Sequence, residues 1–225
     1  MNKEQYNIIE QYMHISMEDS AHDKEHIYRV LYVALDIAKC ENNIDYDVLI
    51  ASCLLHDIGR REQFENPELC HAAIGGEKAY QYLVGIGWEE KMALDVKNCI
   101  CTHRFRKNNQ PQSIETKILF DADKIDVSGT LGIARTLFYK GQISEPLYTL
   151  DNEGAVLDGK NDIAPSFFQE YKYKIEKLYG NFYTKRGNAI AQERQISAVD
   201  FYNSMLKEIQ DSYEFGKKLL DDEVK

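Results

Sequence analysis

The segment DVLIASCLLHDIG, residues 47–59, decides the fold of this chain. The residues VLIASCLL, from Val48 to Leu55, are apolar or small on every side, which is typical of a helix buried on all faces. His56 and Asp57 follow directly, and Gly59 is a favoured residue just beyond a helix end. The segment therefore predicts a central helix over residues 47–55 that ends in two polar side chains.

Amphipathic helices are predicted on both sides of this segment, because apolar residues recur there with the 3.6-residue helical period. Ser20 and Asp23 form a helix-start signature, Pro67 suits a first helical position, and Gly187 is interpreted as a break. We expect these helices at about residues 20–38, 67–84, 89–103, 113–139, 166–184 and 187–220. Residues 141–165 are rich in Gly, Pro, Asp and Asn and predict a long loop. No segment reads convincingly as a strand, so the predicted fold class is all-α.

The composition indicates a globular chain. Of its 225 residues 44% are hydrophobic, which is enough for one domain with a core. We expect no membrane segment, because no apolar run approaches the roughly 20 residues of a membrane span. The net charge of -10 disfavours binding to nucleic acid, which depends on Lys and Arg neutralising phosphates. A small phosphorylated ligand is still compatible, because a local basic patch suffices.

The five cysteines indicate reduced thiols. Their number is odd, no CxxC pair occurs, and most lie in apolar helical segments. Cys99 and Cys101 form one close pair, but a zinc site of this kind would need a second pair. Both are interpreted as small buried side chains, and we expect the protein to be cytoplasmic.

Histidine and aspartate side chains are placed on several core-facing helical surfaces. They are His26, His56, Asp57, His71, His103 and Asp123. Burying so many polar groups is costly unless they are paired or bind a cation, and imidazole with carboxylate suits Mn, Fe, Co, Ni or Zn. A single histidine on an apolar face is more often a core residue with a satisfied hydrogen bond. The indication of a metal site therefore rests on the joint occurrence of the set.

Three motifs occur in order: HIYRV at residues 26–30, LLHDIG at 54–59 and DADKID at 121–126. The segments DADKIDVSGTLGIARTLFYKG, residues 121–141, and YTKRGNAIAQERQ, residues 183–195, add to them. Together they resemble the HD-domain metal-dependent phosphohydrolases, in particular small bacterial HDIG-type hydrolases, some of which are nucleotide pyrophosphohydrolases. The resemblance covers about residues 20–140. It implies a single HD domain over residues 1–225, an all-α helical bundle with additional C-terminal helices at about 166–220.

The resemblance also implies a divalent metal ion, which could be Mn, Fe, Co, Ni, Mg or Zn. By their positions in the motifs, its ligands would be His26, His56, Asp57 and Asp123, with Asp121 as the alternative to Asp123. HD proteins with two ions place further ligands where His71 and His103 lie, so one ion is expected and a second stays an open alternative. These two histidines could instead support the other ligands or bind substrate phosphate. Asp126 could hold a ligand in place.

The reaction implied is hydrolysis at phosphorus by metal-activated water. Asp57 would orient the water, and Glu65, or Glu62 as the alternative, would help to position the water or the leaving group. Basic residues beside the motifs are candidates for binding substrate phosphate, because a guanidinium makes bidentate contacts with it. These candidates are Arg29, Arg104, Lys124 and Arg135. For Arg60, Arg61 and Arg106 a solvated surface charge or a salt bridge is the favoured interpretation.

The expected function is that of a phosphohydrolase acting on a small phosphorylated metabolite, in particular a nucleotide. Two alternatives stay open. Some HD-fold proteins use six such ligands to hold two irons and oxidise a substrate with dioxygen, and an HD module can also sense a nucleotide without turnover. Formation of a homodimer is also an open alternative. We hypothesise that the loop at 141–165 is a lid over the site.

Overall fold

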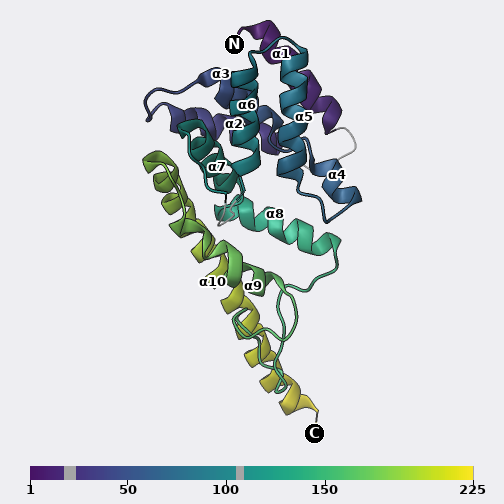
Figure 1. The fold of residues 1–225 in the computed structure, drawn as a ribbon. Coiled ribbons are helices and arrows are strands. Elements are labelled where there is room, and N and C mark those ends of the chain that lie inside the picture. Colours follow the sequence, from purple (N-terminus) through teal and green to yellow (C-terminus); the bar gives the residue numbers. More distant parts are fainter. Residues whose placement is uncertain (18–23, 105–108, 225) are drawn as a thin grey trace. The chain divides into compact units, whose positions relative to one another are not determined.

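The protein is predominantly helical in the residues that the computed structural model describes, which are 1–17, 24–104 and 109–224 (Figure 1). The α-helices are α1 Lys3–Ser16, α2 Lys24–Ala38, α3 Tyr46–Leu55, α4 Arg60–Glu65, α5 His71–Gly85, α6 Glu90–Thr102, α7 Ile114–Asp126, α8 Gly129–Gln142, α9 Phe167–Glu170 and α10 Lys185–Glu223. A π-helical turn, Tyr171–Ile175, and a 3₁₀ turn, Leu178–Gly180, follow α9. Within the described ranges there is no strand, and the all-α prediction is confirmed. The predicted helix start at Ser20 and Asp23 lies outside the described residues.

The chain divides into two compact units. The first consists of Met1–Asp126 together with Tyr183–Gly187, and the second of Val127–Phe182 together with Asn188–Lys225. The first unit therefore contains helices α1 to α7, and the second contains α8, α9 and most of α10. The organisation as one domain over residues 1–225 stays a prediction.

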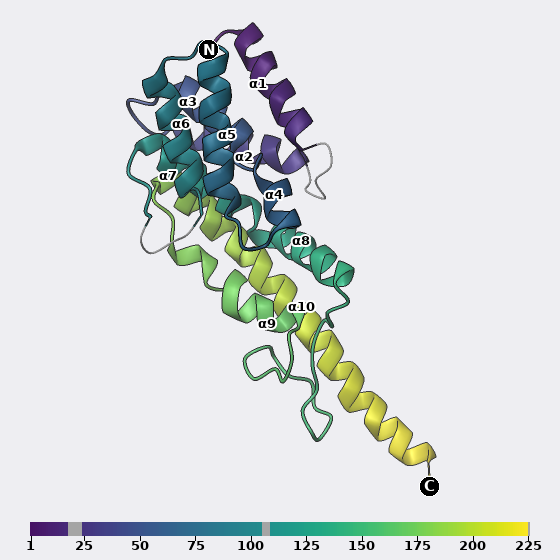
Figure 2. The same ribbon diagram turned by 45° about the vertical axis from the view of Figure 1, so that its right-hand side comes forward.

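Helix α3 is the centre of the first unit, as its apolar sequence predicts. It begins where the Asp45 side chain accepts hydrogen bonds from the N–H groups of Asp47 (3.0 Å) and Val48 (3.1 Å), which satisfies two free donors of the first turn. From there to Leu55 nearly every residue is buried. Helix α3 packs against α1, α2, α5, α6 and α7 (Figure 2). The residues that directly follow it consequently lie deep in the unit.

Helix α5 begins at His71 and not at Pro67. Before it, the Asn66 side chain accepts a hydrogen bond from the N–H of Glu68 (3.1 Å), and the Asn66 carbonyl accepts one from Leu69 (3.0 Å). These bonds close a turn where the sequence predicted the first turn of a helix. The prediction for Pro67 is therefore wrong.

The helix predicted over residues 113–139 is two helices, α7 and α8. Its start is confirmed, because the Ser113 hydroxyl accepts a hydrogen bond from the N–H of Thr116 at 3.2 Å. The chain breaks before α8 at Gly129, whose φ of 66° lies in the left-handed region that glycine adopts at little cost. The prediction of one continuous helix is wrong for that reason.

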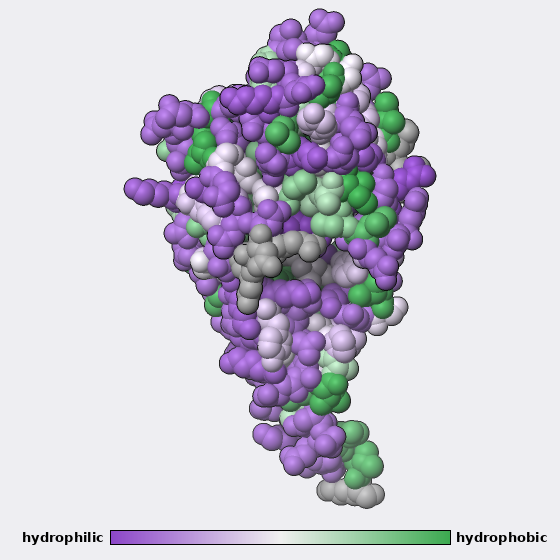
Figure 3. Space-filling view, in the orientation of Figure 1, coloured by the Kyte–Doolittle hydropathy of each residue, from purple (hydrophilic) through white to green (hydrophobic). Residues whose placement is uncertain are grey.

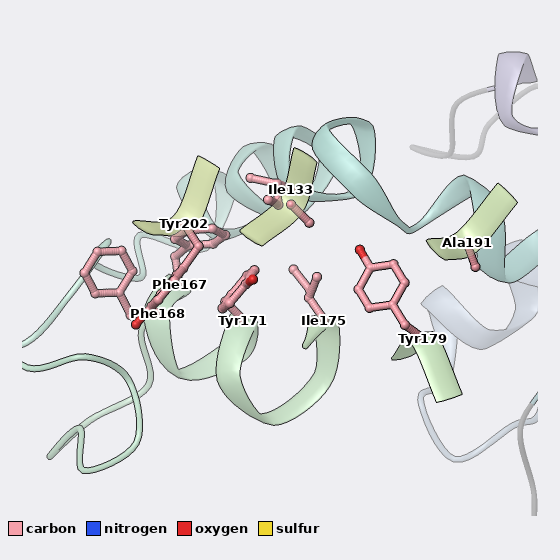
Figure 4. Close-up of a cluster of buried hydrophobic side chains, with 9 residues drawn as sticks. Ile133, Phe167, Phe168, Tyr171, Ile175, Tyr179, Ala191 and Tyr202 are labelled. Carbon is pink, nitrogen blue, oxygen red and sulfur yellow. The ribbon is translucent and has the colours of Figure 1, made fainter. Parts of the chain in front are cut away.

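The core of the second unit is largely aromatic (Figure 4). Phe167 and Phe168 of α9 are buried there with Tyr171 of the π-helical turn and Tyr202 of α10. The Tyr171 and Tyr202 rings stack with centroids 4.1 Å apart and planes 4° from parallel. The helix predicted over residues 166–184 is therefore a short α-helix followed by π-helical and 3₁₀ turns. Irregular chain from 143 to 166 confirms the predicted long loop, while its role as a lid stays a prediction.

Helix α10 continues through Gly187, where the sequence predicted a break. The Gly187 N–H donates to the Thr184 hydroxyl oxygen at 3.0 Å, and that hydroxyl donates to Asp121 Oδ2 at 2.7 Å. A Cβ atom at position 187 would lie 2.7 Å from the same Asp121 oxygen. Glycine fits here because the carboxylate approaches the backbone closely, and the predicted break is wrong.

The face of the molecule drawn in Figure 3 is mainly hydrophilic, with hydrophobic side chains scattered among polar ones. Such scattered apolar side chains are ordinary on the surface of a folded protein. Among the helices that the structure describes, none is both long enough and apolar enough to cross a membrane.

Candidate metal centre

The structure brings the six predicted histidines and aspartates together in the first unit. His26 comes from α2, His56 and Asp57 directly follow α3, His71 opens α5, His103 directly follows α6, and Asp123 lies on α7. The four histidines and Asp57 are buried, whereas the Asp123 side chain is 21% exposed. Their ligand atoms form two groups, His26–His56–Asp123 and Asp57–His71–His103, and within each group all atoms lie within 4.8 Å of one another. We call these the first and the second ligand group.

The first ligand group is compact. The Nε2 atoms of His26 and His56 are 3.2 Å apart. Asp123 Oδ1 is 3.3 Å from the His26 nitrogen and 3.8 Å from the His56 nitrogen. Two imidazole nitrogens and one carboxylate oxygen therefore surround a single small space, which suits a divalent ion.

The second ligand group repeats this arrangement with different residues. The Nε2 atoms of His71 and His103 are 3.4 Å apart. Asp57 Oδ1 is 3.4 Å from the His71 nitrogen and 3.9 Å from the His103 nitrogen. The donor set is again two imidazoles and one carboxylate.

Asp57 lies between the two groups. Its Oδ2 atom is 3.7 Å from His26 Nε2 and 3.8 Å from His56 Nε2, so its second oxygen faces the first group. This Oδ2 atom is buried and has no hydrogen-bond partner among the described residues. An ionised oxygen without a partner in the interior is costly. A cation in the first ligand group would remove that cost.

In each of the four histidines Nδ1 faces away from the ligand groups and Nε2 faces into them. The hydrogen bond of Nδ1 determines whether Nε2 can act as a metal ligand. His56 Nδ1 donates to the Cys53 carbonyl at 2.8 Å, and His103 Nδ1 donates to the Ile100 carbonyl at 2.6 Å. A carbonyl only accepts, so a neutral ring bound to it presents the lone pair of Nε2 to the centre. Nδ1 of His71 lies 2.6 Å from Gln63 Oε1, and Nδ1 of His26 lies 2.7 Å from Asp126 Oδ2. Each ring therefore has an acceptor behind it and points its other nitrogen inward.

The electrostatics of the centre favour a positive charge in the first ligand group. Burial lowers the pKa of His56 to about 4 and that of His71 to about 3, so both rings are neutral near pH 7. Burial also opposes charging of His26, but hydrogen bonds with Asp123 and Asp126 outweigh it and raise the pKa of His26 to about 9. Although burial works in the opposite direction, the neighbouring histidines and Arg60 hold the pKa of Asp57 well below its usual range. Ionised carboxylates beside the neutral rings of His56 and His71 suit a divalent ion, which would displace the second proton of His26.

Glu65, the second predicted catalytic residue, is not brought into either ligand group. Its side chain is 62% exposed at the end of α4, where Arg61 Nε donates to it at 3.1 Å. Arg61 is itself 54% exposed, as expected of a surface charge. The role predicted for Glu65 is not supported by this position.

The predicted phosphate-binding residues have different surroundings. Arg29 forms a bidentate ion pair with Asp126, at 2.6 Å from Nε and 3.2 Å from Nη2. Lys124 Nζ lies 4.3 Å from the centre of the Phe120 ring, and burial lowers the pKa of this lysine. Arg104 is half-buried next to His103, and Arg135 lies on α8 of the second unit.

The other arginines differ in their surroundings. Of its two alternatives Arg60 adopts the salt bridge, because its Nε donates to the buried Asp57 Oδ1 at 2.9 Å. Arg106 lies outside the described residues. Asp126 holds His26 in place as predicted, whereas Gln63, which holds His71, was missed. No periodicity or motif marks Gln63, since it lies on the short helix α4.

Comparison with known proteins identifies the class of this domain. Residues 24–128 match the family model of the HD domain, and this range contains every member of both ligand groups. These residues therefore match the HD domain, as the motifs predicted. HD domains bind divalent metal ions, and the two ligand groups are donor sets that could hold them.

Similar proteins are found in Bacillus species. YpgQ of Bacillus subtilis is 26% identical over 196 residues, which are 85% of this chain and 86% of YpgQ. The crystal structure of YpgQ in complex with ADP has a TM-score of 0.70 and 26% identity, and the match covers 91% of this chain and 98% of that one. An HD-superfamily hydrolase from Bacillus thuringiensis matches with a TM-score of 0.70 and 25% identity, over 92% of this chain and 97% of that one.

Proposed function

We propose that this protein is a divalent-metal-dependent phosphohydrolase acting on a small phosphorylated metabolite, in particular a nucleotide. The observation that carries the proposal is the convergence of four inward-facing imidazole nitrogens on the buried carboxylate of Asp57, whose Oδ2 has no hydrogen-bond partner among the described residues. A bound divalent ion would lower the pKa of a coordinated water molecule and polarise a phosphoryl oxygen.

In this proposal the first ligand group holds the ion that is always needed. Its ligands would be His26, His56 and Asp123, together with Oδ2 of Asp57. The second ligand group would hold a second ion through His71, His103 and Oδ1 of Asp57. Asp57 would thus supply a ligand atom to each group and would orient the attacking water.

The proposed substrate class is supported by two observations. The related protein YpgQ forms a complex with ADP. In this chain the half-buried Arg104 directly follows His103, and its charge is one of the causes that lower the pKa of His71, which places a cation close to the second ligand group. Arg29, Lys124 and Arg135 keep proposed roles in phosphate binding. Glu65 keeps its proposed role in positioning the water or the leaving group only if its side chain separates from Arg61.

The experiment that tests this function is phosphate and pyrophosphate release from nucleoside mono-, di- and triphosphates, with Mn, Fe, Co, Ni, Mg, Zn or no metal added. His56→Ala and Asp57→Ala should abolish release. His14→Ala is the matched control, because His14 lies outside both ligand groups and contacts Tyr28. Metal-dependent release that both variants lose supports the proposal. Release that persists in either variant, or that needs no metal, contradicts it.

The two-group geometry also favours one alternative, a di-iron oxygenase. Two imidazole–carboxylate groups that share Asp57 could equally hold two irons. An iron-dependent visible absorption with dioxygen consumption, and no phosphate release with any metal, would support this alternative. A nucleotide that binds with the metal present and is recovered unchanged would support a sensing module.

A further inference from the structure

The second ligand group contains a resident cation, Arg60. The Nε atom of Arg60 donates to Asp57 Oδ1 at 2.9 Å. The same oxygen is the only carboxylate atom of the second ligand group, 3.4 Å from His71 Nε2 and 3.9 Å from His103 Nε2. A metal ion in this group would share that oxygen with the guanidinium.

The two ligand groups differ in charge for this reason. The first contains its own carboxylate, Asp123, and also faces Oδ2 of Asp57. In the second, Asp57 is the only carboxylate of the three ligands, and its formal charge is cancelled by Arg60 at 2.9 Å. Charges a few ångströms apart interact strongly in a poorly solvated site. An added cation is therefore less favoured in the second ligand group than in the first.

Arg60 is placed so that it can change partners. It is the first residue of α4, a helix without buried residues, and its side chain is 26% exposed. A guanidinium binds a phosphate group through two parallel hydrogen bonds. Transfer of Arg60 from Asp57 to a phosphate would remove positive charge from Oδ1, and the phosphate itself would add negative charge beside the second ligand group.

We propose that Arg60 makes occupation of the second ligand group depend on a bound phosphate group. Without phosphate, Arg60 neutralises Asp57 Oδ1 and only the first ligand group binds its ion tightly. With phosphate, Arg60 moves to the anion and Oδ1 becomes available to a second ion. This inference rests on the proposed function, because it takes both ligand groups as metal sites and a phosphorylated molecule as the substrate.

The test is a Mn²⁺ titration of the intact protein by calorimetry, with bound ions counted by electron paramagnetic resonance, in the presence and absence of inorganic phosphate. The wild type should bind one ion tightly without phosphate and a second ion only with it. Arg60→Gln should bind the second ion without phosphate at least about tenfold more tightly than the wild type. Arg60→Lys, which keeps the charge, should leave that second ion weakly bound.

Arg61→Gln is the matched control, because Arg61 is the adjacent arginine of α4 and pairs with the exposed Glu65. It should titrate as the wild type does. Tight binding of the first ion shows that each variant is folded, and Arg60→Ala is a second neutral variant if Arg60→Gln does not fold. Wild-type and Arg60→Gln proteins with the same second-ion affinity would overturn the inference, as would a wild type that binds two ions equally tightly without phosphate.

These outcomes can be separated from those of the proposed function. A phosphate-dependent second ion without any hydrolysis would leave this inference standing and contradict the hydrolase. Metal-dependent hydrolysis together with an Arg60→Gln titration that matches the wild type would support the hydrolase and overturn the inference about Arg60.

Discussion

Each histidine of the candidate metal centre is held through the ring nitrogen that faces away from that centre. For His56 and His103 the acceptor is a backbone carbonyl three residues earlier, which substitution of a side chain cannot remove. For His26 the acceptor is the side chain of Asp126, 2.7 Å away and also paired with Arg29. The orientation of His26 is therefore open to test by mutation.

Asp126→Ala should lower the affinity of the protein for its first Mn²⁺ ion by about 10–100-fold, because it removes the acceptor that orients a ligand. Asp126→Asn should have a smaller effect, since its amide oxygen can still accept from His26. Asp36→Ala is the control: Asp36 pairs with Arg186 away from both ligand groups. Calorimetric titration gives the affinities, and an Asp126→Ala protein that binds Mn²⁺ as the wild type does would refute the role of Asp126.

The buried Tyr171 makes a prediction about alkaline stability. Burial raises the pKa of Tyr171 to about 12, against about 10 in an unfolded chain. Between these pH values the folded state keeps a proton that the unfolded state loses, so the free energy of unfolding falls as the pH rises. Tyr171→Phe should therefore lose less stability than the wild type between pH 10 and pH 12.

Urea denaturation at several pH values measures this difference. Tyr32→Phe, at a tyrosine whose side chain is 63% exposed, is the matched control. If wild type and Tyr171→Phe lose the same free energy of unfolding above pH 10, the phenol of Tyr171 does not titrate as its burial requires.

At the residue scale, the sequence reveals the ligand groups better than their surroundings. His26 and His103 could be identified because they share helical faces with apolar residues, and His56 because it follows a buried helix. Gln63 and Arg60 could not be assigned in this way. Their contacts with His71 and Asp57 depend on the direction in which the short helix α4 leaves Gly59, and no periodic pattern records that direction.

At the scale of elements, the start of α10 is held by a buried carboxylate of α7. Asp121 accepts hydrogen bonds from the N–H groups of Tyr183 (2.9 Å) and Thr184 (2.7 Å) and from the Thr184 hydroxyl (2.7 Å). Gly187 lies close enough to Asp121 that any side chain would displace it. The free energy of unfolding should therefore depend strongly on this glycine.

Gly187→Ala should lower the free energy of unfolding by about 1–3 kcal/mol, because the new methyl group has no space beside Asp121. Gly216→Ala in the same helix has open space around its Cβ and should raise it by up to about 1 kcal/mol through higher helix propensity. Chemical denaturation of both variants compares the two effects. Equal changes in the free energy of unfolding at the two positions would show that helix propensity alone, and not the contact with Asp121, determines the effect of alanine in α10.

The helices show where sequence patterns mislead. The apolar run of α3 predicted its position to within one residue at its start, because burial on all sides leaves no ambiguity. Glycine is more ambiguous. Gly129 breaks the chain through a positive φ, whereas Gly187 stays helical and only permits a close approach. The residue type is the same, and only the tertiary contact distinguishes the two cases.

At the scale of the whole molecule, metal binding should be linked to stability. Both ligand groups belong to the first unit, and their residues come from helices α2 to α7 or directly follow them. A ligand that binds only the folded state raises the free energy of unfolding, by about 2.7 kcal/mol at a free concentration 100 times its dissociation constant. Mn²⁺ should therefore raise the Tm of the wild type, and a chelator should reverse the shift.

His56→Ala should show no such rise in Tm, because it lacks a ligand of the first group. Differential scanning calorimetry with Mn²⁺, and then with a chelator, measures both proteins. A Tm that rises equally in wild type and His56→Ala would mean that the stabilising ion binds elsewhere on this acidic chain, whose net charge is -10.

The most direct test of the metal centre is the anomalous scattering of Mn²⁺ in crystals of the protein, grown with and without inorganic phosphate. We expect one anomalous peak among His26, His56, Asp57 and Asp123 without phosphate. With phosphate, a second peak should appear among Asp57, His71 and His103. Crystals that contain Mn²⁺ only at other positions, with no peak at either ligand group, would contradict the assignment of this site as a metal centre.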